Sequence, residues 1–140
     1  MAADPLGDFL ALREVTPRRI VGLISGTSAD GVDAALVEVE GSGEDLRVRL
    51  LEFASQPYAP PLRERVVAAG EASAPALLDL HFELGEVFAG AAGALVEGAR
   101  RRGLAVHLIG SHGQTARHHP RAAGAHGQAA TSAASRTRPC

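Results

Sequence analysis

Cysteine and aromatic residues are scarce in this sequence, and each shortage excludes a class of function. Cys140 is the single cysteine, so no disulfide can form within the chain, which is typical of a reducing compartment. Aromatic residues make up 4% of the chain, tryptophan is absent, and the net charge is -2 with both signs interspersed. Nucleic-acid binding usually needs aromatic stacking platforms or a basic patch. We therefore expect no nucleic acid as a partner.

Long apolar runs are also missing. No stretch approaches the roughly 18 apolar residues of a membrane span, and residues 1–16 lack the basic start and apolar run of a signal peptide. We expect no membrane partner and a cytoplasmic location. What remains is an ordinary globular composition, 46% hydrophobic and 21% charged over 140 residues, which suffices for one domain.

Residues 19–40, RIVGLISGTSADGVDAALVEVE, have the pattern of a β-hairpin with a polar tip. Two apolar runs predict strands over 19–24 and 32–40, and nearly every residue between them is small or polar. Asp30-Gly31 is a tight-turn signal, because glycine tolerates the positive φ of such turns.

The tip carries two glycines and two hydroxyl groups, so it can offer backbone N–H groups and Oγ atoms to an anion at close range. This predicts a phosphate cradle. An ordinary surface hairpin is the alternative, because glycine, serine, threonine and aspartate are the usual turn residues. The pattern is neither a Walker A loop nor a dinucleotide-binding GxGxxG fingerprint.

A third strand is predicted over residues 46–54, where Leu46, Val48 and Leu50 alternate with arginines and should form one buried face. Three strands joined by short turns make an antiparallel meander. Residues 1–18, before the meander, are expected to be a loosely ordered leader.

The next segment switches to helical periodicity. Pro60 and Pro61 can open a helix that continues through residues 62–72. A longer helix is predicted over residues 76–102, ending at a left-handed Gly103 cap. Its apolar stripe consists of Leu77, Leu80, Leu84, Val87, Phe88, Ala91 and Leu95.

The long helix also contains four glycines and a histidine. Gly85, Gly90, Gly93 and Gly98 suggest close packing against the sheet, and a compositional bias towards glycine and alanine is the alternative. His81 lies at the edge of the stripe, where a packed or capping histidine is commoner than a ligand.

A further strand is predicted over residues 104–109, parallel to a neighbour after the helical crossover. The polar segment 110–120 follows it, at the position where open α/β sheets bind ligands. Its side chains could hydrogen-bond the hydroxyls of a polar substrate, and a loop that only caps the sheet is the alternative. Zinc is disfavoured, because no carboxylate or thiolate has suitable spacing to His112, His118 and His119.

Three of these stretches together resemble one family. Residues 22–33 (GLISGTSADGVD), 80–89 (LHFELGEVFA) and 109–115 (IGSHGQT) with Arg117-His118 are similar to the N-terminal part of 1,6-anhydro-N-acetylmuramic acid kinases. Ala29 stands where that family usually carries methionine or another larger apolar residue. The resemblance implies an α/β fold, the N-terminal lobe of the acetate and sugar kinase, hsp70 and actin (ribonuclease H-like) fold, present over residues 19–120.

The resemblance implies a bacterial enzyme of peptidoglycan recycling. Such kinases use ATP and Mg²⁺ to phosphorylate O6 of 1,6-anhydro-N-acetylmuramic acid while water opens the anhydro ring, giving N-acetylmuramic acid 6-phosphate; a homodimer is compatible with full-length members. By resemblance, ATP phosphates would bind Gly26, Thr27, Ser28, Ala29, Asp30, Gly31, Val32 and Asp33. The amino sugar would bind Ser111, His112, Gly113, Gln114 and Thr115. Metal ligands are left unassigned.

The resemblance ends near Pro120, and residues 121–140 contain no valine, isoleucine, leucine or aromatic residue. We expect a disordered tail there, produced by a frameshift. The family's catalytic aspartate and adenine-binding lobe would lie beyond this point, so no catalytic residue is assigned in this chain. We expect an inactive, truncated kinase; a non-catalytic phosphate- or sugar-binding fragment and a non-functional gene product are the alternatives.

Overall fold

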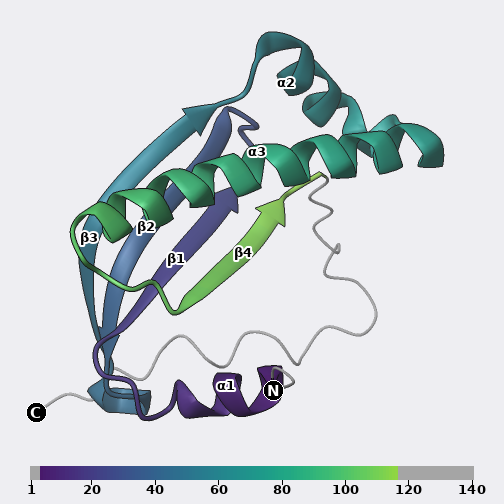
Figure 1. Ribbon diagram of the computed structural model, residues 1–140. Coiled ribbons are helices and arrows are strands. Elements are labelled where there is room, and N and C mark those ends of the chain that lie inside the picture. The colour runs from purple at the N-terminus through teal and green to yellow at the C-terminus, as the bar shows by residue number, and fades with distance from the viewer. Residues whose placement is uncertain (1–3, 117–140) are drawn as a thin grey trace, which may run out of the picture.

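The computed structural model describes residues 4–116, which form one mixed sheet with helices (Figure 1). In chain order the elements are α1 (Pro5–Ala11), β1 (Arg18–Ser25), β2 (Gly31–Glu40), η1 (Gly43–Asp45), β3 (Arg47–Pro57), α2 (Pro60–Val67), η2 (Ala68–Glu71), α3 (Ala74–Arg101) and β4 (Leu108–Gln114). The sheet has the strand order β3-β2-β1-β4, and α3 lies across one of its faces.

The first three strands form the predicted antiparallel meander. β1 pairs with β2 from Arg18↔Val39 to Ile24↔Asp33, and β2 pairs with β3 along its whole length. The alternating residues of β1 and β2 that face α3 are buried. They are Val21, Leu23, Ser25, Val32, Ala34 and Leu36.

The turn between β1 and β2 differs in detail from the prediction. Its positive φ of 51° belongs to Ala29, and Gly31 has no positive φ. Gly31 is required for another reason, because a Cβ there would lie 2.3 Å from the Gln56 carbonyl oxygen. The glycine therefore permits the close approach of β3 to the start of β2.

The predicted buried face of β3 is wrong. Leu46, Val48 and Leu50 are all at least half exposed. β3 lies at the edge of the meander, and the side chains of Val48 and Leu50 pair with Val39 and Val37 on the face that α3 does not cover. A register shift between Leu36 and Val37 then alters the alternation of β3.

The long helix is confirmed, with capping at both ends. The Ser73 side chain accepts a hydrogen bond from the Ala76 N–H, and Pro75 stands in the first turn. Gly103 has a φ of 71°, and the Leu104 N–H reaches back to the Ala99 carbonyl. The shorter helix begins at Pro60 as predicted but ends at Val67, before η2.

The core lies between α3 and the covered face of the sheet. α3 contributes Leu80, Phe88, Ala91, Ala92, Leu95 and Ala99 to it. Close packing explains few of the helical glycines: a Cβ at Gly98 would meet the Glu52 carboxylate at 3.4 Å, but Cβ atoms at Gly85 and Gly93 would meet nothing within 4 Å.

An acidic side chain is buried at the far end of the covered face. Glu38 pairs with Arg19 at 3.0 Å and also with Arg49. Burial opposes ionisation of Glu38, but hydrogen bonds and charges from Arg49 and Arg19 outweigh it, so the pKa of this carboxyl is lowered.

The last strand is parallel to β1, as predicted, but its bounds are wrong. β4 begins at Leu108 and includes Gly110 to Gln114, so the polar segment is strand rather than loop. Residues 104–107 instead connect α3 to β4, and the His107 N–H donates to the Arg19 carbonyl.

A short helix precedes the sheet. The leader, expected to be loosely ordered, contains the exposed helix α1 with Asp4 as its N-cap. The predictions for residues 121–140 lie outside the described residues. The mixed sheet with its covering helix is consistent with the predicted N-terminal lobe of the sugar kinase and actin fold.

Candidate functional site

The two predicted motifs meet at one end of the sheet. β4 runs parallel to β1, so the carboxyl ends of both strands lie together, close to α2 and the start of α3 (Figure 1). The β1–β2 loop, residues 26–30, follows β1 there. The Thr115 N–H donates to the Ser25 carbonyl at 3.2 Å, which joins the two motifs directly.

The β1–β2 loop is exposed except at one residue. Gly26, Thr27, Ser28 and Asp30 face solvent, whereas the Ala29 methyl group is buried. The Ala29 N–H donates to the Gly26 carbonyl at 3.3 Å, which closes a tight turn. The buried methyl group anchors the turn on the core, so its polar atoms are held at the surface.

The exposed part of the loop keeps hydrogen-bond donors available. Within residues 4–116, no hydrogen bond uses the backbone N–H or the hydroxyl group of Thr27 or Ser28. A Cβ placed on Gly26 would meet nothing within 4 Å, so space is open beside these donors. Clustered free N–H groups with room beside them suit an anion.

The other residues predicted for phosphate binding lie in β2. Val32 is completely buried, so its side chain belongs to the core. Asp33 is exposed and pairs with Ile24 on the face that α3 does not cover. Of the eight predicted residues, Thr27 and Ser28 in the β1–β2 loop are the ones whose free donors are described above.

One arginine approaches the loop from α2. Arg63 Nη2 contacts the Asp30 carboxylate at 3.2 Å and the Ser28 carbonyl at 3.5 Å. Both side chains are about half exposed or more, so the pair adds little to stability. The pair with Asp30 has no net charge, but the Arg63 guanidinium places further N–H donors beside the loop.

A bulge in β4 determines which residues face the site. Leu23 pairs with Ser111 and Ser25 pairs with Gln114, so β4 has one more residue than β1 in this interval. Gly113 lies in the interval with a φ of 76°, which favours glycine. Without the extra residue, Gln114 would face the opposite side from Ser25. The bulge therefore turns Gln114 toward the β1–β2 loop.

The amide of Gln114 connects four groups. Its Nε2 donates to the Gly26 carbonyl at 2.9 Å and to the Thr115 carbonyl at 3.0 Å. Its Oε1 accepts from the Ser25 hydroxyl at 2.7 Å and from the Tyr58 hydroxyl at 2.9 Å. Both donor hydrogens of this amide are thus used, and two protein hydroxyl groups lie at its oxygen.

The two hydroxyl groups that reach Gln114 are buried. Ser25 is 2% exposed and Tyr58 is 6% exposed. Burial raises the pKa of the Tyr58 phenol, and a hydrogen bond with Ser25 partly opposes that rise. Tyr58 therefore keeps its proton at neutral pH and acts as a donor. Its backbone N–H also binds the Asp30 carbonyl at 3.0 Å.

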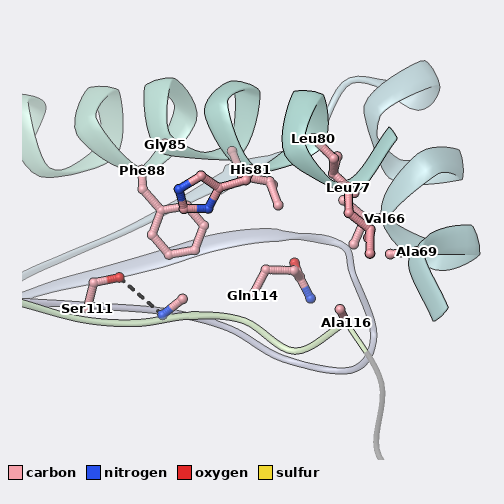
Figure 2. A pocket seen from close by; sticks show the side chains of 12 residues that line it. Val66, Ala69, Leu77, Leu80, His81, Gly85, Phe88, Ser111, Gln114 and Ala116 are labelled. Atoms are coloured by element: carbon pink, nitrogen blue, oxygen red, sulfur yellow. Dashed lines mark hydrogen bonds between the residues drawn. The ribbon is translucent and has the colours of Figure 1, made fainter. Parts of the chain in front are cut away.

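A cavity of about 340 Å³ opens beside this cluster, between α3, α2 and β4 (Figure 2). Phe88 and His81 reach into it from α3, opposite Ser111 and Gln114 of β4. Most of its wall is apolar, with Leu80 and Val66 among the lining residues. An apolar wall with a few polar groups is the usual form of a small-molecule site.

The structure places only some of the predicted sugar-binding residues at the cavity. Ser111, Gly113 and Gln114 line the cavity, and Ser111 Oγ accepts from the Gly113 N–H at 3.1 Å (Figure 2). His112 is exposed and Thr115 half-buried, and neither lines the cavity.

His81, at the edge of the apolar stripe of α3, is not packed in the core. His81 is exposed at the cavity and contacts the Phe82 ring edge-on, with 5.6 Å between ring centroids, rather than capping the helix. No cluster of three or more histidine, cysteine, aspartate or glutamate side chains suited to a metal ion occurs in residues 4–116. His118 and His119 lie outside the described residues.

Within residues 4–116, no helix is long and apolar enough to cross a membrane.

Sequence reasoning missed Tyr58 and Arg63 as parts of the site. Tyr58 is 56 residues from Gln114, and Arg63 is 33 residues from Asp30. Neither residue belongs to a local motif. The one available signal is that Tyr58 is the single tyrosine of the sequence and lies two residues before the start of α2.

Comparison with known proteins gives a consistent result. Residues 18–136 match the family model described as Anhydro-N-acetylmuramic acid kinase. Proteins with that name are similar to this chain: one from Trichormus variabilis is 50% identical over 107 residues, 74% of this chain and 26% of the relative. One from Synechococcus elongatus is 49% identical over 109 residues, 76% of this chain and 28% of the relative.

A relative with lower sequence identity has the same name. The relative from Caldanaerobacter subterraneus subsp. tengcongensis is 43% identical over 106 residues, 74% of this chain and 27% of the relative. The chain thus spans about a quarter of the length of the curated relatives that it matches.

Proposed function

The chain belongs to the anhydro-N-acetylmuramic acid kinase family, and from this premise we propose that its β1–β2 loop binds the phosphate groups of ATP. The observation that carries the proposal is the set of free donors on Thr27 and Ser28, beside the open space at Gly26. Phosphoryl transfer depends mainly on positioning and on neutralising charge, so an amide- and hydroxyl-rich loop is suitable equipment.

Arg63 supports the same proposal. Its guanidinium lies beside the loop, paired with the Asp30 carboxylate, and it retains donors that an entering phosphate oxygen could use. The Ala29 methyl group, buried under the turn, keeps the loop against the core while the phosphate binds outside. Val32 acts through packing, not through contact with ATP.

We propose Mg²⁺ as the accompanying metal. Mg²⁺ usually keeps several waters and binds through one or two carboxylates together with substrate phosphates, so it needs no preformed protein cage. Asp30 and Asp33 are exposed carboxylates at the end of the sheet where the loop lies, and they fit this limited role. When bound, the metal would neutralise phosphate charge.

For the sugar we propose the cavity between α3 and β4. Ser111 supplies a hydroxyl group there, and the apolar wall around Phe88 suits the non-polar parts of an amino sugar. The acceptor would be 1,6-anhydro-N-acetylmuramic acid, with O6 taking the γ-phosphoryl group and water opening the anhydro ring. The products would be N-acetylmuramic acid 6-phosphate and ADP, in a cytoplasmic step of peptidoglycan recycling.

These 140 residues taken by themselves are proposed to bind nucleotide without turnover. The family resemblance assigns the water-activating aspartate and the adenine site to segments outside them. Asp30 is paired with Arg63, and Asp33 lies on the sheet face away from the cavity, so neither is placed to act as the catalytic base. A non-catalytic phosphate-binding role is thus the second candidate function, favoured by the same free donors.

Calorimetric titration of the chain with ATP and Mg²⁺ tests the proposal. Gly26→Val fills the open space beside the donors without a clash, so the variant should fold and lose binding. Gly22→Val is the matched control, because a Cβ at Gly22 also meets nothing within 4 Å but lies in mid-strand. Equal ATP binding by both variants would refute the proposed loop. Formation of ADP and N-acetylmuramic acid 6-phosphate from ATP and the anhydro-sugar by wild-type chain would refute the proposal of binding without turnover.

A further inference from the structure

We propose that Gln114 is a positioning residue, not a sugar ligand, and that its amide sets the direction in which the β1–β2 loop presents its phosphate-binding N–H groups. The part of the inference that concerns phosphate rests on the proposed function. The tether between Gln114 and the loop is independent of it.

The orientation of the Gln114 amide is fixed by what surrounds it. Nε2 lies 2.9 Å from the Gly26 carbonyl oxygen and 3.0 Å from the Thr115 carbonyl oxygen, and carbonyl oxygens only accept. The reverse orientation would place Oε1 against both oxygens and repel them. Donation to Gly26 is therefore a requirement of the site, not one of two equivalent arrangements.

The bond to Gly26 controls the next peptide group. In a trans peptide the carbonyl of one residue and the N–H of the following residue point in opposite directions. Gln114 and the Ala29 N–H together hold the Gly26 carbonyl inward, so the Thr27 N–H is directed outward to the exposed side of the loop. That N–H is one of the free donors proposed for phosphate.

Two buried hydroxyl groups hold the other end of the amide. Ser25 Oγ lies 2.7 Å from Oε1 and 2.6 Å from the Gly31 carbonyl oxygen, and its single hydrogen can serve one of these acceptors at a time. Tyr58 supplies a full donor to Oε1 at 2.9 Å. Gln114 is thus held by β1 and by the segment before α2 while it holds the loop.

The same bonds occupy the Gln114 amide. Its two donor hydrogens bind carbonyl oxygens, and its oxygen has the Ser25 and Tyr58 hydroxyl groups within 2.9 Å. A sugar hydroxyl could bind only by displacing one of these partners, which would release the loop or leave a buried group unpaired.

Gln114→Met tests the tether, because methionine has similar length and forms no hydrogen bond with carbonyls. The Ala29 amide, which donates to the Gly26 carbonyl, should exchange with deuterium faster, while β1 and β2 remain protected. The affinity for ATP with Mg²⁺ should fall about tenfold, the effect of losing one to two net hydrogen bonds. Gln56→Met is the control, since Gln56 is an exposed glutamine on β3 outside this cluster. Unchanged exchange and affinity would overturn the proposal.

Gln114→Glu provides a readout that general loss of structure would not produce. An ionised carboxylate would face two carbonyl oxygens, but a protonated one can donate again. Affinity relative to wild type at each pH should therefore recover as the pH falls toward the carboxyl pKa. A ratio that does not change with pH, in a folded variant, would contradict the positioning role.

Tyr58→Phe tests whether tyrosine acts through the glutamine. Alone it should weaken ATP binding by less than Gln114→Met, and it should add nothing when combined with Gln114→Met. Full additivity would overturn the arrangement. If Gln114→Met does not fold, the loss of ATP affinity in Tyr58→Phe alone still tests the arrangement.

The two proposals fail in different ways. If wild type binds no nucleotide, the proposed function is wrong, and the exchange of the Ala29 amide in Gln114→Met still decides the tether. If wild type binds ATP and Gln114→Met does so equally well, only the positioning role is wrong.

Discussion

The two faces of the sheet are built from the same kind of strand but have opposite surroundings. On the face under α3, Val21, Val32 and Leu36 are completely buried. On the other face, Val48, Leu50 and Phe53 are each more than half exposed. The described part of the chain therefore has one packed layer and one open apolar surface.

The difference shows how little an apolar residue says about its own burial. Leu36 and Leu50 both occupy strands with alternating patterns, and only their position relative to α3 separates them. The covered face also continues into the site, because Ser25 follows Val21 and Leu23 on the same side of β1. Stability and the candidate function should thus depend on the covered face, and self-association on the open one.

The largest expected effect comes from truncating one leucine on each face. Leu36→Ala should cost about 2–5 kcal/mol in the free energy of unfolding, because it leaves a cavity in the core. Leu50→Ala should cost less than about 1 kcal/mol, since its side chain is already largely in solvent. Urea denaturation of both variants measures the contrast. Equal losses would mean that the open face is packed in solution.

Two glycine substitutions give a second, smaller contrast in the free energy of unfolding. Gly31→Ala should destabilise the protein by about 1–3 kcal/mol, because the new methyl group would overlap the β3 backbone at Gln56. Gly22→Ala, on the open face, should change the unfolding free energy by less than about 1 kcal/mol. Thermal melts of the two variants would decide this. A neutral Gly31→Ala would contradict the close approach of β2 and β3.

Acid should affect the covered face through Glu38. Its pKa is lowered in the folded protein, so its contribution to stability is present above the ordinary carboxyl pKa and is lost as the pH falls through the folded value. Wild type should lose more stability between neutral pH and acid than Glu38→Gln, measured by urea denaturation across this range. Glu40→Gln, at an exposed position, should follow wild type. Parallel pH profiles for wild type and Glu38→Gln would refute the ion-pair account.

The smallest change in stability is expected from polar substitution on the open face. Leu50→Ser with Phe53→Ser should leave the melting temperature nearly unchanged and reduce self-association in sedimentation velocity. The corresponding control on α1, Phe9→Ser, removes another exposed aromatic residue outside the sheet. If it reduces association equally, the open sheet face is not the responsible surface.

Local signals in the sequence predicted much of this fold. The β1–β2 hairpin, the proline start of α2 and the Gly103 cap of α3 each depend on a few neighbouring residues, and all were found. The burial of β3 was not predictable, because it depends on which face α3 covers. The positive φ expected of Gly31 belongs to Ala29, whose methyl group is buried against the core, and no local signal marks that residue.

The sequence predicts two site motifs but not how they lie relative to each other. Residues 26–33 and 111–115 were identified, and the parallel pairing of β1 with β4 brings them together. The role of Gln114 depends on the extra residue that Gly113 allows in β4 and on Tyr58, far away in sequence. No pattern within a single motif contains that information.

The central claim is that the covered face ends in a phosphate-binding loop, and nuclear magnetic resonance tests it most directly. Backbone amide signals of ¹⁵N-labelled chain would be followed during titration with ATP and Mg²⁺. We predict the largest shifts at Thr27 and Ser28, smaller ones at Thr115, and none at Val48 or Leu50 on the open face. Shifts confined to the open face, or no shift in residues 26–30 at saturating nucleotide, would contradict the account.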